Sequence, residues 1–170
     1  QLMDERYEAD DFCGTLSKKF EGQVPARILT KDNDYLQLVT ERTNLWLMHS
    51  TAEKTDALFS KYHIDKKTVN VPERAFCFTP ELVEQEFGVK PCHINSLKGL
   101  QGDASDNIKG VSGVGPVAAV KLIQEYGTVE ALYAAIDGLD AAGEKELKEY
   151  WKEHLGLKRS PLSYLKKESD

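Results

Sequence analysis

The stretch GDASDNIKGVSGVGPVAAVKL (residues 102–122) joins an acidic loop, a glycine-rich turn and an apolar helix start in one continuous segment. Its aspartates Asp103 and Asp106 are three residues apart, a spacing that lets two carboxylates face one point on a helical turn. Pro116 follows Gly115 and opens the apolar segment, as proline does at the first position of a helix. Free backbone N–H groups and the helix dipole make such a turn a phosphate site. Carboxylates that can hold metal beside amides that can hold phosphate indicate a nuclease.

The composition is typical of a soluble globular protein with one compact domain, or with one domain and a small helical annex. The chain has 170 residues, of which 41% are hydrophobic and 29% are charged. No apolar run approaches the ~18 residues that a membrane span needs, and we expect no signal peptide. The cysteines Cys13, Cys77 and Cys92 lie far apart and outside CxxC pairs, which favours free thiols in a reducing cytoplasm. Because the chain opens on Gln1, we expect a fragment.

The formal net charge of −6 at pH 7 argues against a nucleic-acid partner unless the acids are clustered. Seven carboxylates do fall in three short motifs, and without them the chain has no excess of negative charge. Divalent cations bound by these clusters would add positive charge. An acidic chain can therefore still present a surface that accepts phosphates.

Hydrophobic periodicity and capping residues predict strands and helices in the first half of the chain and helices alone in the second half. We expect strands at 24–30, 43–48 and 75–78, and helices at 8–21, 35–39, 55–62, 80–88, 92–101, 116–126, 129–136 and 143–154. The tail, residues 160–170, is expected to end without a closing element.

The first two acidic clusters each have two interpretations. Glu8, Asp10 and Asp11 open the first expected helix, where acids complement the helix dipole, but three neighbouring acids repel one another unless a cation is near. Asp32 and Asp34 follow an expected strand, and ligands of α/β sheets bind beyond the carboxyl ends of strands. One of these two can be an N-cap of the next helix, which leaves the other unexplained.

The third cluster, Asp103 and Asp106, can likewise be explained by turn chemistry alone. Convergence of the three clusters favours a metal site instead. Carboxylates without interleaved histidine or cysteine are hard oxygen ligands that suit Mg²⁺ or Mn²⁺ rather than zinc. The histidines show no ligand spacing, and we interpret all four as ordinary surface or core residues: His49, His63, His93 and His154.

Three motifs, in this order, resemble the bacterial 5′-nuclease family. They are YEADD (7–11), ILTKDNDYLQL (28–38), and GDASDN followed by GVSGVG (102–115). The family comprises the 5′→3′ exonuclease domain of DNA polymerase I and stand-alone bacterial and phage relatives, with the flap endonucleases as more distant kin. The resemblance covers about residues 7–133.

The resemblance implies an α/β fold in two parts. The first, 1–90, would be the C-terminal part of a PIN-like nuclease core, a mostly parallel sheet flanked by helices, with residues 50–78 as an atypical insertion. The second, 91–170, would be an all-helical DNA-binding part with a helix–three-turn–helix element at 92–126, a variant of the helix-hairpin-helix motif.

The activity that the resemblance implies is Mg²⁺- or Mn²⁺-dependent hydrolysis of DNA phosphodiesters near the 5′ end of a flap, nicked or branched strand. The implied roles are DNA replication and repair, including removal of RNA primers. By motif match, Glu8, Asp10 and Asp11 would serve the first of two ions, with Asp10 shared. The second would be served by Asp32, Asp34, Asp103 and Asp106.

The glycine-rich turn would hold a duplex phosphate, and its carbonyls a K⁺ ion, without reading base sequence. The implied DNA-binding residues are Lys109, Gly110, Ser112, Gly113, Val114, Gly115 and Lys121. Ser112 and Val117 stand where relatives often have lysine, which predicts a weaker grip on DNA.

The family carries further metal ligands and a basic helical arch that this sequence lacks, so we expect the chain alone to be inactive or nearly so. DNA is the expected partner of a monomeric protein of the bacterial cytoplasm, with no membrane and no small-molecule cofactor. Two other hypotheses stay open: a non-catalytic, structure-specific DNA-binding module that uses only the glycine turn, and an unrelated α/β domain whose acids are caps.

Overall fold

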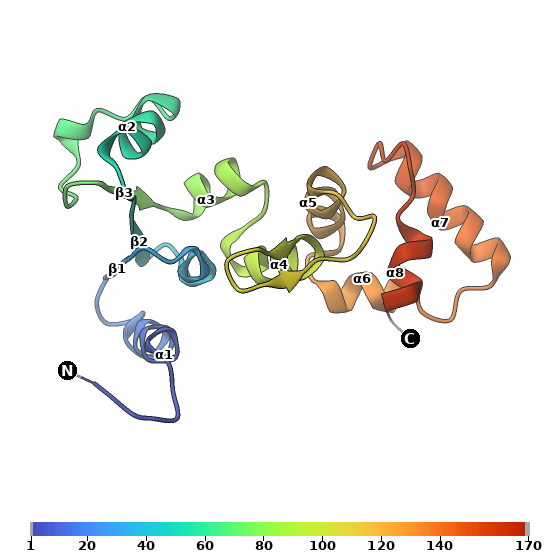
Figure 1. Cartoon of the computed structure of the whole chain (residues 1–170), viewed down its shortest axis with the longest axis horizontal. Coiled ribbons are helices and arrows are strands. Elements are labelled where there is room, and N and C mark those ends of the chain that lie inside the picture. Colours follow the sequence, from blue (N-terminus) through green and yellow to red (C-terminus); the bar gives the residue numbers. More distant parts are fainter. Residues whose placement is uncertain (1, 169–170) are drawn as a thin grey trace. The chain divides into compact units, whose positions relative to one another are not determined.

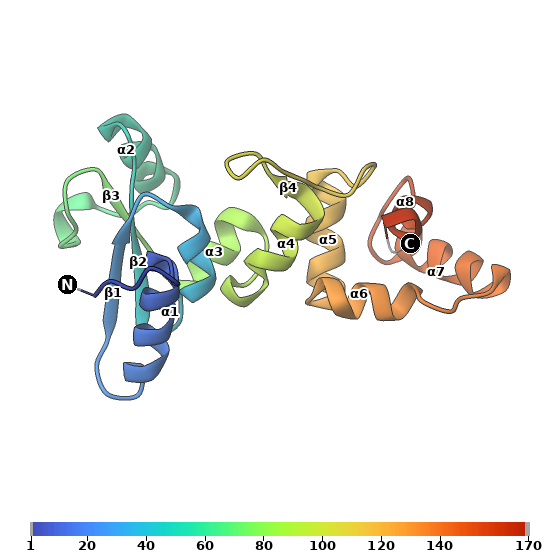
Figure 2. The same cartoon turned by 60° about the horizontal axis from the view of Figure 1, so that its bottom comes forward.

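The computed structural model describes residues 2–168, which form two compact units (Figures 1 and 2). The first unit holds residues 2–86 and 90–92, and the second holds residues 87–89 and 93–168. The helices found between residues 2 and 168 are all too short or too polar to cross a membrane.

The first unit is built on a three-stranded sheet with β2 (Thr43–Met48) at its centre. On one side β1 (Ala26–Thr30) pairs with β2 in parallel, and on the other side β3 (Ala75–Phe78) pairs with it antiparallel. The mostly parallel sheet that we expected is therefore not confirmed. The reason is the route of the chain after β2, which returns β3 to the end where β2 stops, so that Met48 pairs with Ala75.

Helices and 3-10 turns accompany these strands, and their apolar faces bury the core of the unit. The rings of Phe76 and Phe78 are buried with centroids 5.0 Å apart, and Phe59 of the helix after β2 meets Phe76 at 5.0 Å. The elements are α1 (Ala9–Phe20), η1 (Asn33–Leu38), α2 (Ala52–Lys61), η2 (Lys66–Thr68) and α3 (Pro80–Phe87). The stretch 50–78 thus contributes the helix α2 and the largely buried edge strand β3 to this unit.

The second unit is helical apart from one short hairpin. Its helices pack around side chains that are fully buried, among them Leu100, Leu122, Leu132 and Trp151. After η3 (Pro91–His93), which joins the two units, the elements in chain order are α4 (Ile94–Gln101), β4 (Gly102–Asp103), β5 (Ile108–Lys109), α5 (Pro116–Tyr126), α6 (Val129–Ile136), α7 (Ala141–Glu153) and α8 (Leu162–Glu168). The bounds expected for the helices at 116–126 and 129–136 are confirmed.

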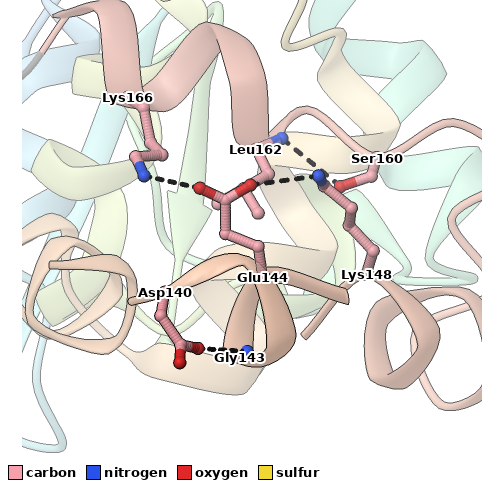
Figure 3. A network of polar contacts seen from close by, with 7 residues as sticks. All are labelled: Asp140, Gly143, Glu144, Lys148, Ser160, Leu162 and Lys166. Carbon is pink, nitrogen blue, oxygen red and sulfur yellow. Dashed lines mark hydrogen bonds and ion pairs between the residues drawn. The ribbon is translucent and has the colours of Figure 1, made fainter. Parts of the chain in front are cut away.

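The helix α8 corrects our expectation that the tail has no closing element. Leu162 and Leu165 are fully buried, so the tail contributes to the core of the second unit. Figure 3 shows the polar contact that adds to this anchor: Lys166 of α8 lies 2.6 Å from the Glu144 carboxylate of α7, which Lys148 of the same helix also approaches, at 3.2 Å. The sequence pattern missed this helix because its apolar face becomes apparent only when α6 and α7 are in place.

The Glu144 pairs predict an acid-dependent loss of stability. Lys166, and then Lys148, holds the pKa of the Glu144 carboxyl below its ordinary value of 4.5. The pairs therefore stabilise the fold above about pH 4.5, and this contribution is lost as the pH falls through the lowered folded pKa. We expect Glu144→Gln to reduce the melting temperature slightly at pH 7 and not at pH 3, as measured by circular dichroism. Glu149→Gln, on the exposed face of α7, is the control, and an equal effect at both pH values would contradict the prediction.

Candidate functional site

In the first unit, three of the predicted ligands line one hollow. Asp10 and Asp11 come from the first turn of α1 and Asp34 from η1, and the hollow has a volume of about 310 Å³. The two elements come close because Gly14 faces Leu38: a Cβ atom at Gly14 would lie 3.4 Å from Leu38 Cδ2. The fold therefore brings together acids that are more than twenty positions apart in the sequence.

Backbone capping explains part of this cluster and not all of it. Asp11 Oδ2 accepts a hydrogen bond from the Glu8 backbone at 3.1 Å, and Asp10 Oδ1 accepts one from the Asp11 backbone at 3.0 Å. Asp32 is the N-cap of η1 and accepts from the Asp34 backbone at 2.9 Å. Each of these carboxylates has further lone pairs that a cation can use. Glu8, Asp11 and Asp32 are exposed, whereas Asp10 and Asp34 are half-buried.

Tyr35 lies beside the same acids, and the sequence analysis did not single it out. Its side chain is 8% exposed, and burial, followed by Cys13 and the charges of Asp10 and Asp32, raises its pKa to about 12. The phenol therefore stays protonated at neutral pH. The negative charges of Asp10 and Asp32 both contribute to the raised pKa of this hydroxyl group. The first two acidic clusters therefore influence the same residue. The signal in the sequence was its position directly after Asp34.

In the second unit, Asp103 and Asp106 lie on a hairpin and not on a helical turn, which corrects our expectation. Asp103 ends β4 and pairs with Ile108 of β5, and Asp106 is exposed in the connecting turn. The base of this hairpin requires glycine on both sides. A Cβ atom at Gly102 would lie 2.3 Å from the Gly110 nitrogen, and one at Gly110 would lie 2.2 Å from the Gln101 carbonyl carbon.

The Asp103 carboxylate has partners on both oxygens. Lys98 Nζ, from the last turn of α4, donates to Oδ2 at 2.5 Å, and Ser105 donates to Oδ1 from its backbone at 2.9 Å and from its hydroxyl group. Lys98, and then Ser105, holds the pKa of this carboxyl well below its usual range. The carboxylate is therefore ionised throughout the physiological range. The sequence alone does not single out Lys98, because a lysine near a helix end is ordinarily explained by the helix dipole.

The donor sets of both units fit a hard divalent cation. Three carboxylates line the hollow of the first unit beside Lys18 and uncharged groups, and two lie on the hairpin of the second, with neither histidine nor cysteine among the predicted ligands. Such sets suit Mg²⁺ and Mn²⁺. The three cysteines are free thiols, as expected.

The glycine-rich turn uses its glycines for two different purposes. Gly113 has a φ of +78°, and a Cβ atom there would lie 2.5 Å from the Tyr164 ring of α8. Gly115 is the N-cap of α5 with an ordinary φ of −77°, and nothing lies within 4 Å of the place where its Cβ would be. The fold therefore requires glycine at 113, whereas at 115 glycine leaves open space in front of a helix N-terminus.

The other predicted DNA contacts differ in how accessible they are. Lys109 and Ser112 are exposed, whereas Val114 is buried and its backbone donates to the Val111 carbonyl at 3.0 Å. Lys121 Nζ donates to the Leu155 carbonyl at 2.6 Å, so its ammonium group has a structural contact as well. The roles of these residues toward DNA stay predictions.

Two models of one protein family match most of the chain. Residues 1–70 match the N-terminal resolvase-like domain of the 5′-3′ exonucleases, and residues 89–166 match their C-terminal SAM fold.

Curated relatives point the same way. DNA polymerase I of Bacillus caldotenax is 39% identical over 88% of this chain and 15% of its own length. The 5′-3′ exonuclease of Mycoplasma pneumoniae is 31% identical over 80% of this chain and 40% of its own length. The chain thus spans well under half the length of these relatives.

Solved structures share the fold. The bacteriophage T5 D15 protein crystallised with metal ions superposes with a TM-score of 0.58 at 20% identity, over 88% of this chain and 47% of that one. A T5 D15 flap endonuclease in complex with DNA and metal ions gives a TM-score of 0.54 at 20% identity, over 93% of this chain and 46% of that one.

Proposed function

Since the chain belongs to the 5′-3′ exonuclease family, we propose that it is the metal-binding and duplex-binding part of a structure-specific 5′-nuclease. Its reaction would be hydrolysis of DNA phosphodiesters near the 5′ end of a flap, nicked or branched strand. The observation that carries the proposal is the hollow of the first unit, where Asp10, Asp11 and Asp34 from two separate elements line one space. Caps alone give no reason for three acids to face one hollow.

The carboxylates of the three acidic clusters would hold two divalent ions, Mg²⁺ or Mn²⁺. When bound, such ions activate the attacking water and stabilise the leaving oxygen. Glu8, Asp10 and Asp11 serve mainly the first ion, with Asp10 shared. The second ion is assigned to Asp32, Asp34, Asp103 and Asp106. Asp103 supports this role by its place at the base of the hairpin, where its charged carboxylate is held by Lys98 and Ser105.

The glycine-rich turn would position the duplex. Gly115 supports this, because the open space in front of α5 lets a phosphate approach its N–H groups and the positive end of its dipole. Lys109, Gly110, Ser112, Gly113 and Val114 belong to the same proposed surface, as does Lys121. A K⁺ ion held by the turn carbonyls is part of the proposal.

The proposed biological role is replication and repair, including removal of RNA primers, in a monomeric bacterial protein. We keep the expectation that this chain alone does not cut DNA. A nuclease assay on a 5′-flap substrate with Mg²⁺ or Mn²⁺ checks it, and robust cutting would contradict it.

Replacement of Gly115 tests the DNA-binding half of the proposal. We expect wild-type chain to bind a fluorescent 5′-flap duplex with an affinity that falls as salt rises, because phosphate contacts release counterions. Gly115→Ala should weaken binding about 5- to 10-fold, since a methyl group would stand where the phosphate approaches, at the cost of ~1–1.4 kcal/mol. Its melting temperature should be unchanged.

Gly22→Ala is the matched control, because Gly22 also has nothing within 4 Å of its Cβ position but lies outside the turn. Equal binding by wild type and Gly115→Ala in fluorescence anisotropy would reject the turn as the DNA contact. No binding by wild type would reject this half of the proposal altogether.

A further inference from the structure

Lys98 and Asp103 form an ion pair within the second unit that is largely shielded from solvent. The Lys98 side chain is 27% exposed and that of Asp103 is 12% exposed, with Nζ and Oδ2 at 2.5 Å. The other described ion pairs are more open to solvent, among them Lys66–Asp56 with side chains 44% and 55% exposed. Exposed pairs of that kind contribute little and exchange readily with water. The Lys98–Asp103 pair at the base of the hairpin therefore differs from these exposed pairs.

The ammonium group of Lys98 occupies a place that a cation bound to Oδ2 would need. Oδ1 already accepts two hydrogen bonds from Ser105, so Oδ2 is the oxygen with the greater remaining capacity. A carboxylate oxygen has about two lone-pair directions, and the ammonium uses one of them. A divalent ion on the same oxygen would lie close to a positive charge and be repelled by it.

We propose that Lys98 is a positioning residue whose ammonium group takes the place of a bound cation at Asp103. In the metal-free protein the ammonium group neutralises the carboxylate and holds it at the hairpin base. When a divalent ion binds, the ammonium group yields Oδ2 to it. Lys98 thereby lowers the affinity of Asp103 for the ion. When no ion is bound, it neutralises the negative charge of the Asp103 carboxylate. This inference rests on the proposed metal role of Asp103.

Titration of the chain with Mn²⁺, with free Mn²⁺ measured by electron paramagnetic resonance, tests the inference without any nuclease assay. We expect Lys98→Met to bind Mn²⁺ about 10-fold more tightly than wild type, within the range that neighbours of metal ligands typically control. Lys98→Arg, which keeps the charge, should bind as wild type does. Lys152→Met removes an exposed lysine of α7 and should have no effect.

A second measurement separates competition from a merely structural role. In EDTA, Lys98→Met should melt at a lower temperature than wild type, because Asp103 has lost its counter-charge. Saturating Mn²⁺ should raise its melting temperature by more than it raises that of wild type, since tighter binding stabilises the folded state more. Lys98→Gln is the substitute if the methionine variant does not fold.

The outcomes distinguish failure of the inference from failure of the proposed function. If Asp103→Ala loses Mn²⁺ while Lys98→Met binds no more tightly than wild type, Lys98 does not compete and the inference is rejected alone. If Asp103→Ala binds as wild type does, or if wild type binds no Mn²⁺, the metal role of Asp103 and the inference are both rejected.

Discussion

Asp34→Asn is expected to lower the affinity of the chain for Mn²⁺ at least roughly 10- to 100-fold, and Asp103→Asn to do the same. That range is the loss caused by removing even an outer partner of a metal ligand, and each of these carboxylates is proposed as a direct ligand. Asparagine keeps the shape of aspartate and removes its charge, so the change isolates electrostatic binding. Free Mn²⁺ measured during a titration provides the readout.

The double variant makes this prediction sharper, because the two aspartates are both assigned to the second ion. If they serve one ion, the two losses of binding free energy will be coupled and will deviate from additivity by ~0.5–3 kcal/mol. Additive losses would mean independent sites and would contradict the assignment. Asp56→Asn, which removes an exposed acid of α2 that pairs with Lys66, should leave Mn²⁺ binding unchanged.

Gly113→Ala is expected to destabilise the second unit by about 2–4 kcal/mol. Two causes add: the left-handed backbone at φ +78° is strained for alanine, and the new methyl group would lie 2.5 Å from the Tyr164 ring. The Tyr164 side chain is 45% exposed, so its ring can turn toward solvent and relieve part of the clash, whereas the backbone strain remains. Urea unfolding followed by circular dichroism gives the free energy.

Two companion variants divide this loss between its causes. Tyr164→Ala in the Gly113→Ala background removes the clash and should recover part of the stability, leaving the backbone strain. Gly115→Ala, two residues away and without either problem, should be as stable as wild type. A Gly113→Ala variant as stable as wild type would show that the turn adapts at no cost.

Elements defined by their own residues were predictable from the sequence. Thr128 accepts a hydrogen bond from the Ala131 backbone at 3.2 Å, as an N-cap should, and Gly127 ends the preceding helix at φ +78°. The strands at 43–48 and 75–78 were also located correctly. Capping and apolar patterning are local signals, so a single sequence contains them.

Features that depend on distant contacts were not predictable. The direction of β3 follows from the route of α2, and α8 is held by buried contacts to other helices. The acids of the hollow could be named as candidate ligands from the sequence. Only the packing of η1 on α1 through Gly14, however, puts Asp34 in the same hollow as Asp10. The Lys98 contact likewise arises from the hairpin geometry and not from a motif.

The backbone contact between Gly102 and Gly110 makes the segment between them a module. The two ends of the hairpin are held together by this close backbone approach and by the pairing of β4 with β5, so the turn between them has little part in positioning α4 and α5. The turn residues 104–107 can therefore vary with less effect on the helices than Asp103, which contacts Lys98 of α4. For protein engineering, the close approach of Gly102 and Gly110 marks this turn as a place where a foreign loop can be grafted.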